Sequence, residues 1–165
     1  MNPIPDHLAP NLNILFVGYN PSLRSGETGH HYANPRNRFW TILHRADITP
    51  RLFRADEDQD LLELGYGFTN IVARPTRTAA EISVAEYAEG RELLRAKVEK
   101  YRPKVVCFVG KGVYEAFSGK KQVEWGYQAE PIVEGVRAFV APSSSGLVRM
   151  KLEEIVEIFK GIHEA

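Results

Sequence analysis

The chain has 165 residues, of which 44% are hydrophobic and 25% charged, a size and composition expected of one globular domain over residues 1–165. Lys plus Arg and Asp plus Glu number 21 each, so the zero formal net charge argues against attachment to nucleic acid by bulk charge alone, though it does not exclude a local basic face. Cys107 is the only cysteine, which excludes an internal disulfide and a multi-cysteine metal site.

In chain order, four apolar segments are predicted to form strands: residues 13–18, 67–72, 104–110 and 137–143. The first, third and fourth are continuous apolar runs, which is typical of strands buried on both faces of a parallel sheet. Cys107 lies in the third run and is expected to be a small buried hydrophobe.

Helical segments lie between and after these strands. Asn34 before Pro35 resembles an N-cap followed by proline at the first helical position, so a helix is predicted to begin there and to include residues 36–46. Residues 56–65 are predicted to form a short helix with acidic residues in its first turn and a glycine as its stop.

Three further helices are predicted in the second half of the chain. Ser83 and Glu86 match a capping box at the start of a helix that Pro103 closes. Residues 111–118 are predicted to form a short helix. The C-terminal segment carries an apolar stripe at helical spacing, formed by Met150, Leu152, Ile155, Val156, Phe159 and Ile162.

The alternation of strands and helices predicts an α/β fold, a three-layer α/β/α arrangement around a central, mostly parallel four-stranded sheet. Ligands of such folds gather beyond the carboxyl ends of the strands. The residues to inspect are therefore those that follow each strand, at 19–22, at Asn70, at 110–111 and at 143–149.

Taken alone, the residues at the strand ends leave alternatives open. Gly, Asn and Pro after the first strand are also common turn residues. The serines of residues 142–149 suit a phosphate cradle or a solvated loop with a helix cap. No phosphate-loop or dinucleotide motif is present, and His30 and His31 are adjacent without further evident ligands, so we expect neither a cofactor nor a metal.

Five blocks in order then resemble one family. They are GYNPS (18–22), GHHY (29–32), NPRNRFW (34–40), GFTNIVARPT (67–76) and PSSSGLVR (142–149). Together they are similar to the mismatch-specific uracil/thymine DNA glycosylases, a branch of the uracil-DNA glycosylase superfamily. The resemblance covers nearly the whole chain, from about residue 12 to the last helix. Some blocks look like the bacterial mismatch-uracil enzymes and others like the vertebrate thymine-DNA glycosylases.

The resemblance implies cleavage of the N-glycosidic bond of a wrong base in duplex DNA, with no strong base required. The base departs as an anion and the sugar gains oxocarbenium character, so water needs positioning more than deprotonation. By resemblance, Asn20 holds this water through its amide oxygen. The strong uracil enzymes of the wider superfamily carry Asp there, so Asn predicts a slower enzyme that selects mismatches.

The resemblance also implies base-binding residues. Tyr32 occupies the family's position for stacking on the flipped base, although such a tyrosine can also be an ordinary loop aromatic. Backbone N–H groups near Gly18 and Tyr19 would bind a base carbonyl, Asn70 would contact the base edge, and His31 would donate to the base or to a phosphate.

Two departures bear on the substrate. Tyr19 replaces the family's Ile at a position that contributes chiefly backbone, so we expect it to be tolerated. Ser22 replaces a Gly, and its side chain narrows the space expected for a thymine methyl group.

For binding DNA, Leu147 matches the family's wedge that fills the hole left by the flipped base, although it also suits a core leucine at the start of the last helix. Gly146 would let the backbone approach the duplex. Further phosphate contacts are expected from Ser143, Ser144, Ser145, Arg149 and Lys111, with the acidic run 56–60 lying elsewhere.

Two alternatives stay open besides a monofunctional mismatch glycosylase of base excision repair. One is a broader uracil-DNA glycosylase that also acts on single strands or deaminated purines. The other is a non-catalytic relative that binds DNA damage.

We expect a monomer whose partner is duplex DNA with a mismatched or damaged base. The absence of a signal-like N-terminus and of about 18 unbroken apolar residues predicts no membrane contact and a cytoplasmic location, near the nucleoid in a bacterium or in the nucleus of a eukaryote.

Overall fold

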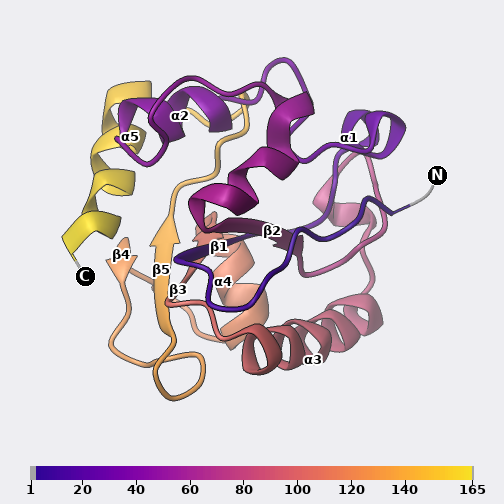
Figure 1. Cartoon of the computed structure of the whole chain (residues 1–165). Helices are drawn as coiled ribbons and strands as arrows, with labels where there is room; N and C mark the ends of the chain where they lie inside the picture. Colours follow the sequence, from indigo (N-terminus) through magenta and orange to yellow (C-terminus); the bar gives the residue numbers. More distant parts are fainter. Residues whose placement is uncertain (1–2, 165) are drawn as a thin grey trace.

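The computed structural model describes residues 3–164, which form a twisted sheet between two layers of helices (Figure 1). The strands are β1 (Ile14–Gly18), β2 (Tyr66–Asn70), β3 (Val105–Val109), β4 (Gly126–Tyr127) and β5 (Arg137–Ala141). Their order is β2-β1-β3-β5-β4, and every neighbouring pair is parallel except β4 with β5. The α/β prediction is confirmed, and the short edge strand β4 adds a fifth strand. Its two residues carry no apolar run, so the hydrophobic pattern does not reveal it.

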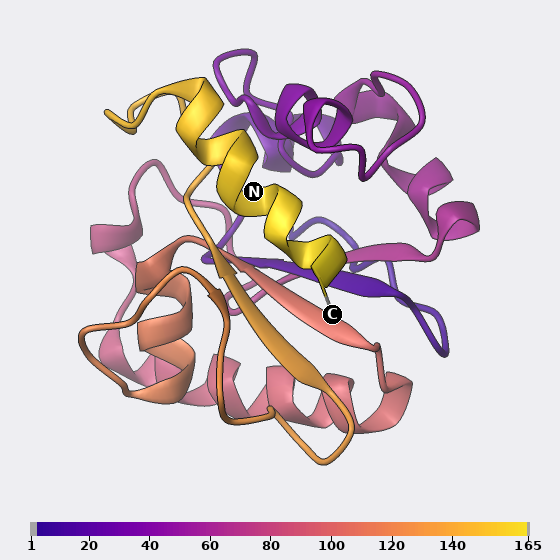
Figure 2. The same ribbon diagram turned by 90° about the vertical axis from the view of Figure 1, so that its left-hand side faces the viewer.

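Helices cover both faces of the sheet (Figure 2). One layer contains α1 (Leu23–Thr28), α2 (Phe39–Arg45), α5 (Leu152–Lys160) and the 3₁₀ helix η1 (Ala55–Leu64). The other contains α3 (Val84–Tyr101) and α4 (Lys111–Ser118). Two short 3₁₀ helices complete the list, η2 (Ala79–Glu81) and η3 (Gly161–Glu164).

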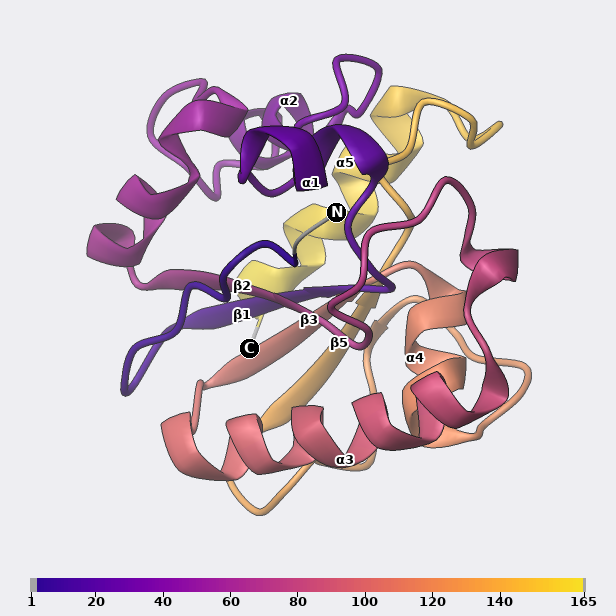
Figure 3. The same ribbon diagram turned by 90° about the vertical axis from the view of Figure 1, so that its right-hand side faces the viewer.

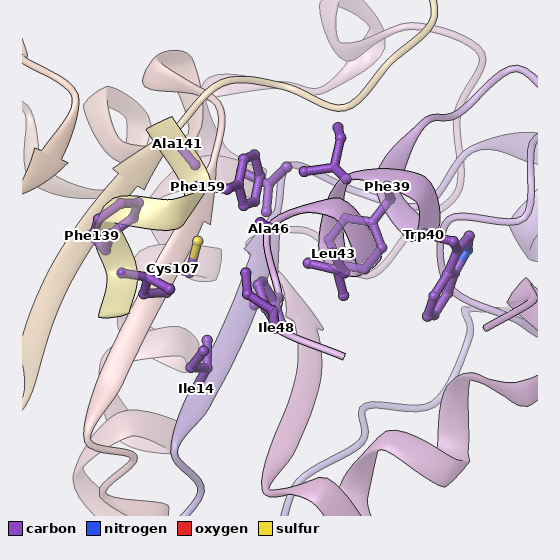
Figure 4. Packing of buried hydrophobic residues seen from close by; sticks show 14 of the residues in the cluster. Ile14, Phe39, Trp40, Leu43, Ala46, Ile48, Cys107, Phe139, Ala141 and Phe159 are labelled. Atoms are coloured by element: carbon purple, nitrogen blue, oxygen red, sulfur yellow. The ribbon is translucent and has the colours of Figure 1, made fainter. Parts of the chain in front are cut away.

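Each central strand contributes to two hydrophobic cores, because side chains alternate across a strand. Ile14 and Phe16 pack with α2 and α5, whereas Leu15 and Val17 pack with α3 and α4. Figure 4 shows the first core from close by, where Cys107 lies among the aromatic and aliphatic side chains. The Cys107 thiol is buried, and this burial raises its pKa. The predicted double burial of the strands is therefore confirmed.

Several helix boundaries follow the predicted signals. The Ser83 hydroxyl accepts from the Glu86 N–H, and the Glu86 carboxylate accepts from the Ser83 N–H, as the capping box requires. The segment at 56–65 is a 3₁₀ helix that ends at Gly65, which has φ +87°. The helix at 111–118 is present as α4.

Two helix predictions need correction, and one helix was missed. Asn34 does not cap a helix: residues 34–37 form a turn in which its Oδ1 accepts from the Arg36 N–H, and α2 begins at Phe39. Asn-Pro is also a turn signal, and here the turn prevails. Helix α5 begins at Leu152, so Met150 precedes it. Helix α1 was not predicted, because its sequence LRSGET has little apolar periodicity.

Within residues 3–164, no helix combines the length and the apolar composition needed to cross a lipid bilayer.

Candidate active site

A cleft of about 500 Å³ opens beyond the carboxyl ends of the strands, where the α/β topology places ligands. Its walls come from the β1–α1 loop, the segment around 31–37, the segment after β2 and the loop after β5. Figure 3 shows these last two segments at the same edge of the sheet, next to the end of β1. Segments far apart in the sequence therefore meet at one site.

The cleft brings most of the predicted site residues together. The predicted residues that line it are Gly18, Tyr19, Asn20, His31, Tyr32, Asn70, Ser143, Ser144, Ser145, Gly146 and Leu147. Lys111 and Arg149 lie outside this lining, and the Lys111 ammonium sits 4.2 Å from the centre of the Trp125 ring. Their contact with DNA stays a prediction.

The Asn20 side chain is held in one orientation. Its Nδ2 donates to the carbonyl of Arg74 at 2.8 Å and to the Thr76 hydroxyl at 2.7 Å. A carbonyl oxygen only accepts, so the nitrogen of the amide must face it. The Thr76 hydroxyl in turn donates to the Thr78 carbonyl at 2.8 Å. These bonds occupy both amide protons, and no residue of the described range donates to Oδ1, which remains an acceptor in a residue that lines the cleft.

The backbone of Gly18 lies at the floor of the cleft with Tyr32 and Asn70. A Cβ on Gly18 would lie 2.8 Å from the Asn70 Oδ1 and 3.3 Å from the Tyr32 hydroxyl, so only glycine leaves room for both side chains. The Gly18 and Tyr19 carbonyls accept from the N–H groups after β2. A Cβ on Gly112 of α4 would overlap the Tyr19 hydroxyl, so the Tyr19 ring packs over that helix.

The Tyr32 ring is fixed against the core. It stacks on Phe39 with ring centres 3.9 Å apart and an interplanar angle of 7°. One face of the ring is therefore covered, and a stacked base has only the opposite face. Burial raises the Tyr32 pKa, so the phenol stays neutral, and its buried hydroxyl has no hydrogen-bond partner among the residues described.

His31 and its neighbours form a buried polar network behind this loop. The Asp58 carboxylate accepts from the His31 N–H at 2.8 Å and from His30 Nδ1 at 3.0 Å. Asp58 is 1% exposed, which corrects the expectation that the whole acidic run 56–60 lies away from the site. A carboxylate from η1 thus fixes the loop that carries Tyr32.

The His31 ring is neutral and carries its proton on Nε2, and its predicted contact with a base or a phosphate stays a prediction. Its Nε2 lies 2.9 Å from the Pro5 carbonyl, which only accepts, so Nε2 carries the proton. Burial lowers the His31 pKa to about 4, and the ring is therefore neutral at pH 7 with an unprotonated Nδ1. The possible ligand atoms of His7, His31 and Asp58 lie within 4.8 Å of one another, and the hydrogen bonds above already engage two of these residues.

We expect acid to destabilise the protein through His31. Its folded pKa of about 4 lies below the unfolded value of 6.5, so the unfolded chain binds the proton first as the pH falls. Stability should be complete above pH 6.5 and decline toward pH 4, by about 3 kcal/mol from this group.

Urea unfolding at several pH values measures this loss. In His31→Phe the pH dependence between 6.5 and 4 should flatten. Substituting the exposed His44 with Gln should leave it unchanged. Equal pH dependence in His31→Phe and the wild type would contradict the assignment.

The loop after β5 is held by Arg38. The Arg38 guanidinium donates to the carbonyls of Ser145, Val148 and Met150 at 3.3–3.4 Å. The backbone N–H of Arg38 donates to the Ser144 carbonyl at 2.9 Å. A loop anchored at four carbonyls keeps a defined shape.

Leu147 projects from this anchored loop into solvent. It is 87% exposed and precedes α5 by several residues, so it is not a core leucine. Gly146 before it packs on the neighbouring turn, since a Cβ there would lie 2.5 Å from the Arg36 carbonyl.

The three serines differ in their surroundings. The Ser143 hydroxyl accepts from the Ser145 N–H, and the Ser145 hydroxyl accepts from the Leu147 N–H, so both shape the loop. Ser144 is 1% exposed. Their predicted contacts with phosphate stay predictions.

Some cleft or support residues escaped the sequence analysis, among them Thr76, Arg36, Arg38, Asp58 and the rim residue Arg77. Thr76, Arg36 and Arg38 lie inside the quoted blocks, which was the available signal. Asp58 and Arg77 lie outside the blocks and look like ordinary surface charges in the sequence.

Comparisons with known proteins agree with this architecture. The model of the uracil DNA glycosylase superfamily matches residues 5–163. The fold is similar to the solution NMR structure of a candidate uracil DNA glycosylase from Methanosarcina acetivorans, with a TM-score of 0.60, 21% identity and 98% of each chain covered. Because the family model spans nearly all of it, the chain belongs to the uracil DNA glycosylase superfamily.

Proposed function

We propose that this chain is a monofunctional DNA glycosylase of base excision repair that excises uracil from G·U mismatches in duplex DNA, with thymine in G·T as a second substrate. The observation that carries the proposal is the Asn20 amide, whose nitrogen is anchored on both protons and whose oxygen is left to hold a water. We also propose that the chain acts as a monomer.

The proposed reaction breaks the bond between the anomeric carbon and the base nitrogen, and the bonding electrons leave with the base. Backbone N–H groups near Gly18 and Tyr19, both in the cleft lining, would stabilise the departing anion. Water held at the Asn20 Oδ1 then adds to the cationic carbon and releases a proton. The products are the free base and an abasic site.

A preference for mismatches follows from the cost of extruding the base. Unstacking and unpairing cost a few kcal/mol, and the cost is lowest where pairing is already poor. The neutral Asn20 amide is not a strong base, so faster chemistry does not offset the cost of extruding the base. The proposed enzyme therefore depends on substrates whose base flips easily.

Thymine depends on the space beside Ser22. The Ser22 hydroxyl accepts from the Ser25 N–H at 3.1 Å and so serves as the N-cap of α1, while the residue still lines the cleft. The hydroxyl is thus committed to the helix, and the side chain leaves less room for a thymine methyl group than the family's glycine would, so we propose G·T as the weaker substrate.

A base-release assay on matched duplexes tests the proposal. We expect free uracil and alkali-labile strands from G·U, weaker release from G·T, and still weaker release from A·U. Comparable release from single strands, A·U and hypoxanthine substrates would favour the broader glycosylase. Tight mismatch binding with no abasic product at any enzyme concentration would contradict the proposal and favour the non-catalytic binder.

A further inference from the structure

We propose that Arg36 and Arg77 bind the DNA phosphates on either side of the flipped nucleotide, an inference that rests on the proposed function. Both residues are exposed, and both line the cleft. They are not among the residues for which the family resemblance implied a role. The ligand is the sugar–phosphate backbone of duplex DNA.

The charge of the cleft supports this assignment. The chain contains 21 acidic residues, yet none of the described residues that line the cleft is Asp or Glu, whereas two are arginines. A protein of zero formal net charge therefore presents a locally positive opening. This local positive charge suits a polyanionic ligand.

Each arginine has a neighbour in sequence that serves the fold instead. Arg38 donates to three loop carbonyls, and Arg74 forms a bidentate pair with Glu86 at 2.9 and 3.0 Å. In contrast, the guanidinium groups of Arg36 and Arg77 make no ion pair or hydrogen bond with residues 3–164. The two segments thus each hold one structural arginine and one whose charge is available to a ligand.

The positions of the two residues define which phosphates they meet. The Arg36 backbone packs against Gly146, one residue before the exposed Leu147. Arg77 follows Thr76, whose hydroxyl accepts from the Asn20 amide. One arginine therefore lies next to the predicted wedge and the other next to the predicted reaction centre, so their phosphates flank the extruded nucleotide.

Salt dependence of DNA affinity tests the inference directly. Each cation that neutralises a phosphate of B-form DNA contributes about 0.9 to the slope of log affinity against log salt concentration. Arg36→Ala and Arg77→Ala should each lower the magnitude of this slope by about 0.9, and the double variant by about 1.8. The affinity gap between wild type and double variant should then shrink about tenfold between about 50 and 200 mM salt.

The probe is a duplex of about two helical turns with one G·U mismatch whose uridine carries a 2′-fluorine, which destabilises the cationic sugar, so no cleavage interferes with the binding measurement. Arg45→Ala is the matched control, because Arg45 is exposed but lies outside the cleft lining, and its slope should equal that of the wild type. Arg36→Lys and Arg77→Lys keep the charge and should restore most of the slope. Thermal unfolding of all variants should coincide, since both guanidinium groups are exposed.

Two failures are distinguishable. If both Ala variants keep the wild-type slope, or change it no more than Arg45→Ala does, the inference is overturned even where the wild type releases uracil normally. If the wild type itself releases no uracil, the proposed function fails, whatever the slopes are.

Discussion

Asn20→Ala is expected to slow uracil release from a G·U duplex by at least about 100-fold, the loss typical when a reacting group is no longer positioned. The amide makes two hydrogen bonds at its nitrogen and none at its oxygen within residues 3–164, so truncation removes the acceptor that we propose holds the water. Affinity for an uncleaved mismatch duplex should be largely retained. Single-turnover base release and equilibrium binding measure the two effects separately, and undiminished release would remove Asn20 from its proposed role.

Asn20→Asp provides a sharper comparison. Superfamily enzymes with Asp at this position are the stronger ones, so the resemblance alone suggests a gain in rate. In this structure the Arg74 carbonyl lies 2.8 Å from the Asn20 Nδ2, and a carboxylate oxygen in that place would oppose it without a proton between them. We therefore expect Asn20→Asp to be slower than the wild type at neutral pH. A faster variant would show that the anchor does not control the orientation at position 20.

Thr76 offers a graded control for the same anchor. Thr76→Val removes one acceptor of the amide and should cost less than Asn20→Ala, because the Arg74 carbonyl remains. Thr76→Ser keeps the hydroxyl that bonds both Asn20 and the Thr78 carbonyl, so it should stay near wild type.

The parts of the fold that depend on local signals could be predicted from the sequence. The strands β1, β3 and β5 are apolar runs, and the capping box at Ser83 is satisfied by bonds within four residues. Asn34 shows the limit of such signals, because one dipeptide suits a helix start and a turn equally. Tertiary packing decides between helix start and turn here, because the backbone N–H of Arg38 donates to the distant Ser144 carbonyl.

Much of the site depends on contacts between residues distant in sequence, and these are the contacts that the sequence analysis did not predict. Asp58 reaches the loop at 30–31 from 27 positions away, and Thr76 reaches Asn20 across 56 positions. A single sequence does not reveal whether Asp58 is a surface charge or a buried acceptor. The resemblance located Asn20 in the cleft, but only the structure shows which end of its amide is available.

Leu147→Ala is expected to lower the rate of uracil release from a G·U duplex by about 10- to 100-fold. Extruding the base costs a few kcal/mol, and this loss of rate corresponds to part of that free energy. Leu147 is 87% exposed on a loop that Arg38 anchors at several carbonyls, so its side chain has no role in the core and a fixed position from which to enter the base stack. An inserted apolar side chain replaces the stacking lost when the nucleotide flips.

The dependence on the substrate separates a wedge from a general loss of activity. Uracil opposite an abasic site lacks a pairing partner and flips more cheaply, so the effect of Leu147→Ala should shrink there. The matched control is Leu52→Ala, at an exposed leucine outside the cleft, which should match the wild type on both substrates. A leucine acting through loop stability would instead lower both rates equally and lower the melting temperature. Because Leu147 is exposed, we expect Leu147→Ala to keep the melting temperature of the wild type and to lose more activity on the duplex whose base is costlier to flip. An equal loss of activity on both duplexes would show that Leu147 is not the wedge.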